Sequence, residues 1–188
     1  MRSSLDGPLR AGIEKFGVRP DIAVFATGVT SGYQPLGGIV ASGRVAAPFW
    51  DEPGRVFRHG QTYAGHPAAC AAGSATIALM EREGLLERAD ALAPQLLERL
   101  QGIADHPLVA HARGGVGVLG ALALDPERLA ATPDLPQRVF RAARERGVLI
   151  RPMGSAIGYS PPLTVTAEHL DLLAEATRAG LDDVAAAL

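Results

Sequence analysis

The spacing of apolar residues changes along the chain, and this change limits the folds that the sequence can adopt. Before residue 104, short apolar runs are followed by long helical stretches, whereas later segments alternate short β-like runs with amphipathic helices. Helical spacing and short runs bounded by glycine or proline are the signals of these two element types. The sequence therefore predicts an α/β chain with a boundary near residue 104. It separates an α/β layer structure over 1–104 from a smaller α+β domain over 105–188.

The first part is expected to contain two strands and two long helices. The strands are predicted at Ile22–Ala26 and Gly37–Ser42, with a glycine- and serine-rich loop between them. An alanine-rich helix is expected from Pro67 to about Glu83, because proline suits a first helical turn, and a second from about Leu85 to Ile103. Cys70 lies in the first of these helices and is expected to be a buried small hydrophobe. A further short helix is expected at Ala11–Phe16.

The second part is expected to form a small mixed domain. The predicted elements are a β-like run at Gly115–Leu124, a helix at Leu135–Arg146, strands at Val148–Arg151 and Ile157–Ser160, and a last helix capped by Thr166. The buried face of that last helix is predicted to carry Leu170, Leu173, Leu181, Val184 and Leu188.

Composition excludes several classes of function. The chain has 188 residues, 47% of them hydrophobic and 20% charged, with a net charge of −2. That is globular composition without the basic surface that nucleic acid or an anionic membrane attracts. No apolar run approaches the roughly 20 residues of a membrane-spanning helix, and Met1–Arg10 lack the apolar core of a signal peptide. A single cysteine excludes an internal disulfide framework, so a cytoplasmic location is expected.

Three motifs follow one another along the chain. The first runs from Phe16 to Gly38, the second is His59–Pro67, and the third joins Gly147–Pro152 to Ser160–Leu163. Together, and in this order, they resemble the C-terminal half of the class III aminotransferases, which are fold-type I enzymes that use pyridoxal phosphate (PLP). The resemblance covers roughly residues 11–188.

This resemblance implies both a fold and an activity. It implies part of a fold-type I PLP-transferase large domain over 1–104 and the C-terminal small domain over 105–188. It also implies PLP-dependent amino transfer between an amine or amino acid and a 2-oxo acid. In the family, the half that this chain lacks supplies most of the PLP site, including the main phosphate-binding loop.

Thr27 stands where the family has the lysine that holds PLP as a Schiff base. A hydroxyl forms no imine with an aldehyde and has no accessible basic pKa, so it can neither anchor the cofactor nor move the substrate proton. The alternative role for Thr27 is a hydrogen bond within a tight loop. The only lysine, Lys15, lies about twelve positions earlier and is not expected to substitute.

Thr62 is the candidate cofactor-binding residue. In the family, the threonine of this motif reaches the PLP phosphate of the neighbouring subunit, and a hydroxyl beside a helix start suits an anion. The alternative is a loop threonine that caps the helix beginning near Pro67. His59 and His66 in the same motif are interpreted as structural residues, so no metal site is predicted.

Arg151 is the candidate substrate-binding residue. It resembles the mobile arginine that clamps the substrate carboxylate, and guanidinium matches a carboxylate with two parallel hydrogen bonds. The alternative is an ordinary arginine facing solvent. The run Gly114–Gly117 resembles a dinucleotide loop only superficially and is interpreted as a turn into a strand of the small domain.

These motifs lead to three hypotheses about function. The first is an incomplete aminotransferase-like chain that is inactive alone and associates with further copies of itself. In the second, a complementing chain supplies the N-terminal half and a lysine. The third is a non-catalytic binding module. Complete relatives would bind small amines and oxo acids, and neither nucleic acid nor membrane is an expected partner.

Overall fold

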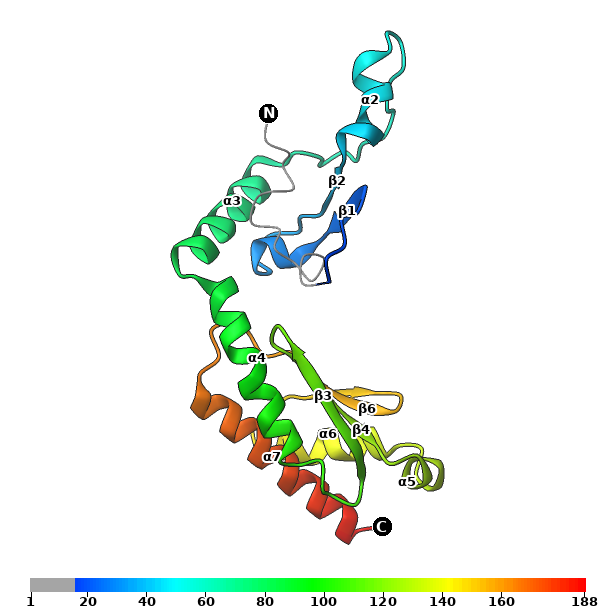
Figure 1. Cartoon of the computed structure of the whole chain (residues 1–188), viewed down its shortest axis with the longest axis vertical. Helices are drawn as coiled ribbons and strands as arrows, with labels where there is room; N and C mark the ends of the chain where they lie inside the picture. The colour runs from blue at the N-terminus through cyan, green and yellow to red at the C-terminus, as the bar shows by residue number, and fades with distance from the viewer. Residues whose placement is uncertain (1–15) are drawn as a thin grey trace. The chain divides into compact units, whose positions relative to one another are not determined.

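The computed structural model describes residues 16–188, with Thr27 described by its backbone alone, and it divides the chain into two compact units that meet at residue 84. Lys15 and the helix expected at Ala11–Phe16 lie outside the described residues. The division differs from the expected boundary near residue 104 because helix α4 (Leu85–Gln101) packs on strands of the second unit. The units are described one at a time below (Figure 1).

Unit 1 contains two strands and two longer helices. Its elements are β1 (Ile22–Phe25), the 3-10 helix η1 (Thr27–Thr30), β2 (Gly38–Ala41), α2 (Gly43–Asp51) and α3 (Pro67–Arg82). Both predicted strands and the alanine-rich helix are confirmed. Strands β1 and β2 pair antiparallel, with Ile22 opposite Ala41 and Phe25 opposite Gly38. Helix α2 was not predicted from the sequence, and it contains Pro48, a residue that usually argues against a helix interior.

Helix α3 approaches the segment after β1 closely, and Gly73 permits this approach. A Cβ atom at Gly73 would lie 2.9 Å from Cδ2 of Leu36 and 3.9 Å from Cγ2 of Thr30. Ala69 and Thr76, four residues before and three residues after Gly73, are buried on the same face. The small side chains of α3 therefore serve the close packing that the sequence predicts.

Unit 1 buries few large apolar side chains. The described residues that it buries are small or polar, namely Thr30, Ala69, Gly73 and Thr76. On one face of the β1–β2 pair, by contrast, Ile22, Val24 and Ile39 are exposed, and Val24 keeps 78% of its surface accessible. A two-stranded sheet with an uncovered apolar face is marginal in water. The described part of unit 1 therefore lacks a core of large apolar side chains, and one apolar face of its sheet is uncovered.

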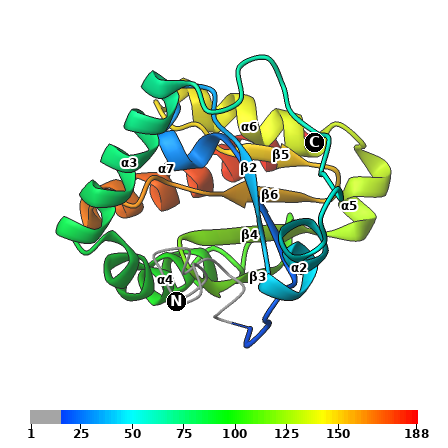
Figure 2. The same ribbon diagram turned by 90° about the horizontal axis from the view of Figure 1, so that it is seen from above.

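Unit 2 is a four-stranded antiparallel sheet with helices. Its elements are α4 (Leu85–Gln101), β3 (Val109–Val116), β4 (Leu119–Leu124), α5 (Pro126–Ala131), α6 (Leu135–Glu145), β5 (Arg151–Met153), β6 (Ala156–Tyr159) and α7 (Ala167–Ala186). The strands lie in the order β3-β4-β6-β5, which Figure 2 shows side by side. The glycines at 114–117 end β3 and turn the chain into β4, as expected.

The core of unit 2 lies between one face of this sheet and helices α4, α6 and α7. Leu96 and Leu100 of α4 and Leu181 of α7 have no exposed surface, and Leu122 and Ile157 meet them from the sheet. Burying each such side chain contributes about 1.5–3 kcal/mol relative to leaving it exposed. The buried face predicted for α7 is confirmed at Leu170, Leu181 and Val184, whereas Leu173 is partly buried and Leu188 is 52% exposed.

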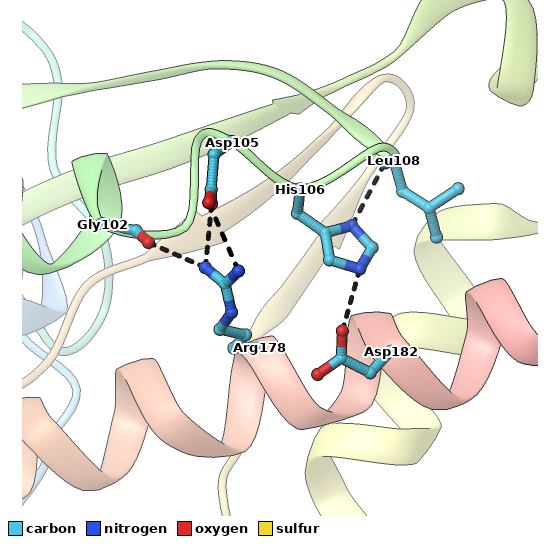
Figure 3. A network of polar contacts seen from close by, with 6 residues as sticks. All are labelled: Gly102, Asp105, His106, Leu108, Arg178 and Asp182. Atoms are coloured by element: carbon cyan, nitrogen blue, oxygen red, sulfur yellow. Dashed lines mark hydrogen bonds and ion pairs between the residues drawn. The ribbon is translucent and has the colours of Figure 1, made fainter.

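A polar network fixes the loop after α4 to α7 (Figure 3). Arg178 donates to the backbone carbonyl of Gly102 at 2.9 Å and to Oδ1 of Asp105 at 2.8 Å. His106 is nearly buried; its Nδ1 accepts from the Leu108 N–H at 3.1 Å, and its Nε2 lies 3.3 Å from Oδ1 of Asp182. This contact pattern places the imidazole proton on Nε2, directed at Asp182. Helix α7 therefore anchors the loop that leads into β3.

Strand β5 begins three residues later than expected. Helix α6 ends in a motif in which the Val148 N–H bonds to the Ala143 carbonyl and the Gly147 N–H to the Arg144 carbonyl. Gly147 has φ +81°, the left-handed conformation that such a helix end requires. Residue 148 therefore belongs to the end of α6, although Val148 and Ile150 are buried as a strand would be.

Candidate functional site

Thr27 lies two residues after the end of β1, as the first residue of η1. Ala26 precedes it in an extended conformation, and the Val29 N–H bonds back to the Ala26 carbonyl at 3.1 Å. The chain thus turns sharply at the end of the strand, in the loop position where sequence reasoning placed a candidate site. At the end of this turn, the Thr30 hydroxyl donates to the Gln34 carbonyl at 2.5 Å and has no exposed surface.

Thr62 lies in an exposed turn before α3, and it does not cap that helix. The Ala64 N–H bonds to the Gln61 carbonyl at 2.9 Å, which closes the turn around Thr62. The cap of α3 is His66, whose Nδ1 accepts from the Ala69 N–H at 3.4 Å. The capping alternative for Thr62 is therefore wrong, whereas the interpretation of His66 as a structural residue is confirmed.

Arg151 is the first residue of β5 and is exposed. Its Cα is paired with that of Gly158 on β6, so its position is fixed by the sheet of unit 2. Its guanidinium has no hydrogen-bond or ion-pair partner among residues 16–188. An exposed guanidinium without a partner among residues 16–188 is able to receive a carboxylate from solution.

The structure divides the three predicted residues between the two units. Thr27 and Thr62 belong to unit 1 and Arg151 belongs to unit 2, so each is placed by its own unit. Cys70, in contrast to its expected burial, is exposed on α3. The prediction failed because only one narrow stripe of this alanine-rich helix is covered.

Sequence reasoning missed Arg88 on the first turns of α4. Its Nε donates to the Leu163 carbonyl at 2.9 Å and its Nη2 to the Val165 carbonyl at 2.8 Å. These bonds fix the segment after β6, which carries the third sequence motif. The partners are more than seventy residues apart in the chain, and no local pattern signals such a contact.

The pKa values of two side chains near these motifs, Asp21 in unit 1 and Tyr159 in unit 2, are shifted. Hydrogen bonds from Arg44 and Ser42 lower the pKa of Asp21, which precedes β1 and ties it to the start of α2. Burial raises the pKa of Tyr159, whose hydroxyl donates to Oγ1 of Thr177 at 3.4 Å. Tyr159 therefore remains a neutral phenol under the helices and is not available as a base.

The part of the chain that the structure describes contains no cluster of three potential metal-ligating side chains. In the same range, no helix is both long and apolar enough to cross a bilayer.

Comparisons with known proteins agree with this α/β architecture. Residues 10–180 match the family model of class III aminotransferases. The chain is 38% identical to the diaminobutyrate–2-oxoglutarate transaminase of Halomonas elongata and 36% identical to the putrescine–pyruvate aminotransferase of Pseudomonas aeruginosa. In both cases the match covers 94% of this chain, but only 40% and 39% of the relative.

Comparison with a solved structure also shows similarity to part of an aminotransferase. An amine transaminase from an uncultivated Pseudomonas species, in a PLP-bound form, superposes with a TM-score of 0.84 at 38% identity. The match covers 92% of this chain and 40% of that one. The chain belongs to the class III aminotransferase family and has part of its fold-type I architecture. It spans about two fifths of the length of these relatives.

Pyridoxal phosphate is the cofactor of this family, and the described residues fit it only in part. Residues 16–188 contain no lysine, so they offer no side-chain amine to the cofactor aldehyde. The exposed hydroxyl of Thr62 is a suitable donor to a phosphate oxygen. Covalent attachment therefore does not fit these residues, whereas a phosphate contact does.

Proposed function

We propose that this chain is an aminotransferase-like polypeptide that contributes substrate and phosphate contacts but does not transfer amino groups alone. In a complete assembly, the reaction would be amino transfer between an amine or amino acid and a 2-oxo acid. The support for the proposal is chemical: the resemblance puts Thr27 at the position of the family lysine, and the single lysine of the chain is Lys15. A cytoplasmic location is part of the proposal.

The residues of this chain would have separate tasks. When bound, PLP supplies the electron sink that stabilises a carbanion at the substrate α-carbon. Arg151 would hold the substrate carboxylate with two parallel hydrogen bonds, and the Thr62 hydroxyl would donate to the cofactor phosphate. A threonine hydroxyl has no accessible basic pKa, so Thr27 would leave the α-carbon proton without an acceptor from this chain.

The same proposal includes a partner. Ile22, Val24 and Ile39 form an exposed apolar face, and neither β1 nor β2 pairs with a further strand among residues 16–188. Both features favour association with protein that adds strands and covers apolar surface. Relatives are more than twice as long as this chain, so the remaining family architecture is the natural occupant, whether on the same polypeptide, on a complementing chain or within a homo-oligomer.

The test is titration of the purified chain with PLP, followed by borohydride reduction and peptide mass spectrometry. We expect no pyridoxyl group on any peptide from residues 16–188 and no amino transfer to pyruvate or 2-oxoglutarate. A full-length class III transaminase serves as the positive control. Amino transfer by the purified chain with PLP as its only addition would overturn the proposal.

A further inference from the structure

His106 is the one buried histidine among residues 16–188, which include all five histidines of the chain. It is 4% exposed, whereas His59, His66, His111 and His169 are exposed to solvent. Histidine is the side chain whose charge ordinarily changes between about pH 5 and pH 8. When a buried imidazole gains a proton and loses a hydrogen bond, water does not readily take the place of the lost partner.

The two nitrogens of the His106 ring contact two different parts of unit 2 (Figure 3). Nδ1 accepts a hydrogen bond from the Leu108 N–H at 3.1 Å, within the loop that joins α4 to β3. Nε2 lies 3.3 Å from Oδ1 of Asp182, which belongs to α7. The first contact requires a lone pair on Nδ1, whereas the second uses an N–H group and is stronger when the ring is positive.

A proton on Nδ1 therefore changes these two contacts in opposite directions. The charged ring carries an N–H on both nitrogens and has no acceptor. The Leu108 N–H would then face another N–H and lose its partner, and Leu108 is only 2% exposed. The contact with Asp182 would become an ion pair.

The Leu108 amide lies at the junction where the loop enters β3. The Val109 N–H donates to the His106 carbonyl at 2.8 Å, and the Asp125 N–H donates to the Leu108 carbonyl at 3.0 Å. Val109 is also paired with Leu124, the last residue of β4. Release of the Leu108 N–H would thus loosen the hydrogen bonds that surround the start of β3 and the end of β4.

The neighbouring charged groups keep their charge while a histidine titrates. The carboxylates and the guanidinium of this region are those of Asp105, Asp125, Arg178, Asp182 and Asp183. The hydrogen bond from Arg178 lowers the pKa of Asp105, so this pair stays ionised above pH 5. Asp125 caps α5 and Asp183 pairs with Arg146, which leaves Asp182 as the carboxylate that meets the ring.

We propose that His106 is a proton-operated switch in the loop between α4 and β3. The neutral ring holds the Leu108 N–H, and the charged ring releases this N–H and forms an ion pair with Asp182. The Arg178–Asp105 pair holds the loop to α7 in both states, so the change is confined to the start of β3. The switch does not depend on the proposed function, because it uses no cofactor or substrate contact.

The test is an NMR titration of the full chain from pH 8 to pH 5. It follows the two ring nitrogens of His106 and the backbone amide of Leu108. We expect the Leu108 amide signal to shift in step with protonation of Nδ1. After correction for the intrinsic pH dependence of exchange, its hydrogen-exchange protection should fall about tenfold, as expected for a buried N–H that loses its acceptor.

Three variants identify the group that responds. His106→Asn places an amide oxygen near the position of Nδ1 without a titrating ring, so the Leu108 amide should stay protected from pH 8 to pH 5. His106→Leu keeps an apolar side chain without an acceptor, and the Leu108 amide should be poorly protected throughout. His111→Gln removes an exposed histidine of β3 and should keep the wild-type response.

Four results would overturn the switch. The first is a His106 ring that stays neutral down to pH 5, and the second is a Leu108 amide that does not change when the ring takes up its proton. The third is a His106→Asn chain that keeps the pH response, because another group would then cause it. The fourth is loss of the response in His111→Gln, which would make His111 the residue that senses pH.

Discussion

Arg178 is one residue that secures a whole loop. Its guanidinium reaches a backbone carbonyl and the carboxylate of Asp105, which lie beyond the end of another helix (Figure 3). The hydrogen bond from Arg178, with the charge attraction, lowers the pKa of Asp105 from its ordinary value of 3.8. Because both groups are largely exposed, the stabilisation is small and sensitive to salt.

The depressed pKa of Asp105 predicts a particular dependence of stability on pH. A carboxyl with a lower pKa in the folded state stabilises the fold above its unfolded pKa, and this contribution is lost as pH falls through the folded pKa. We expect Arg178→Gln to be less stable than wild type at pH 6, with the difference shrinking below about pH 4. Urea denaturation across this range measures it.

The control for this experiment is Arg144→Gln, which removes an arginine of α6 with no partner among residues 16–188. Its difference from wild type should stay nearly constant over the same pH range. A constant difference for Arg178→Gln as well would show that the Asp105 pair does not contribute to the acid response.

The role of a single residue could be predicted from the sequence only where that role depends on neighbouring residues in the chain. His66 follows the turn around Thr62 and directly precedes a proline that starts a helix, yet the cap was assigned to Thr62 as an alternative. The burial of Cys70 was predicted from the small residues around it, but burial depends on which elements lie opposite. The partners of Arg88 lie far away in sequence and could not be inferred.

The helices of unit 2 show how local signals define an element. Helix α7 begins at a capping box, in which the Thr166 hydroxyl accepts from the His169 N–H at 3.3 Å and the His169 ring accepts from the Thr166 N–H at 3.4 Å. The cap was predicted from the threonine alone. The reciprocal bond, which the His169 ring accepts from the Thr166 N–H, was not predicted, because glutamate or glutamine is the usual partner.

Replacing this cap tests how much one hydroxyl contributes to α7. We expect Thr166→Ala to lower the free energy of unfolding of unit 2 by about 0.5–2 kcal/mol, since the His169 N–H would lose its acceptor. Thr164→Ala is the matched control, an exposed threonine two residues earlier, and should change stability by less than about 0.5 kcal/mol. Equal effects of the two substitutions in urea denaturation would contradict the role of the cap.

Long amphipathic elements were predicted well, and short or irregular ones were not. Helices α3, α4 and α6 begin and end within about two residues of their expected bounds, and α7 begins directly after its predicted cap. Strand β3 was largely missed because bulges near Val109 and Gly114 break its alternation. Helix α5 has six residues, too few for a periodic pattern, although the Asp125–Pro126 pair carries a usable start signal.

At the scale of the whole molecule, the two units differ in how much they bury. Unit 2 has a continuous core of large aliphatic side chains, whereas the buried residues described in unit 1 are small or polar. Since buried apolar area is the main favourable term in folding, the stability of the chain is concentrated after residue 84. The sequence predicted two parts of the chain. It could not predict their unequal burial, because burial depends on which other helices and strands cover each element.

Hydrogen exchange of the full chain measures this difference directly. We expect amides in α4, β4, β6 and α7 to exchange on the order of 100-fold or more slowly than amides in β1, β2 and α2, because unit 1 opens at low cost in free energy. Peptide-resolved mass spectrometry gives both units in one experiment. Comparable protection of β1–β2 and β4–β6 would contradict the account.

The exposure of Cys70 on α3 has a practical consequence. The chain has one thiol, it lies in unit 1, and its side chain is open to solvent. A maleimide dye or a nitroxide therefore attaches at one known position without any engineered mutation. A change in the signal of this reporter would show that another protein covers unit 1. Unit 2 contains no cysteine, so the labelling reaction does not modify it.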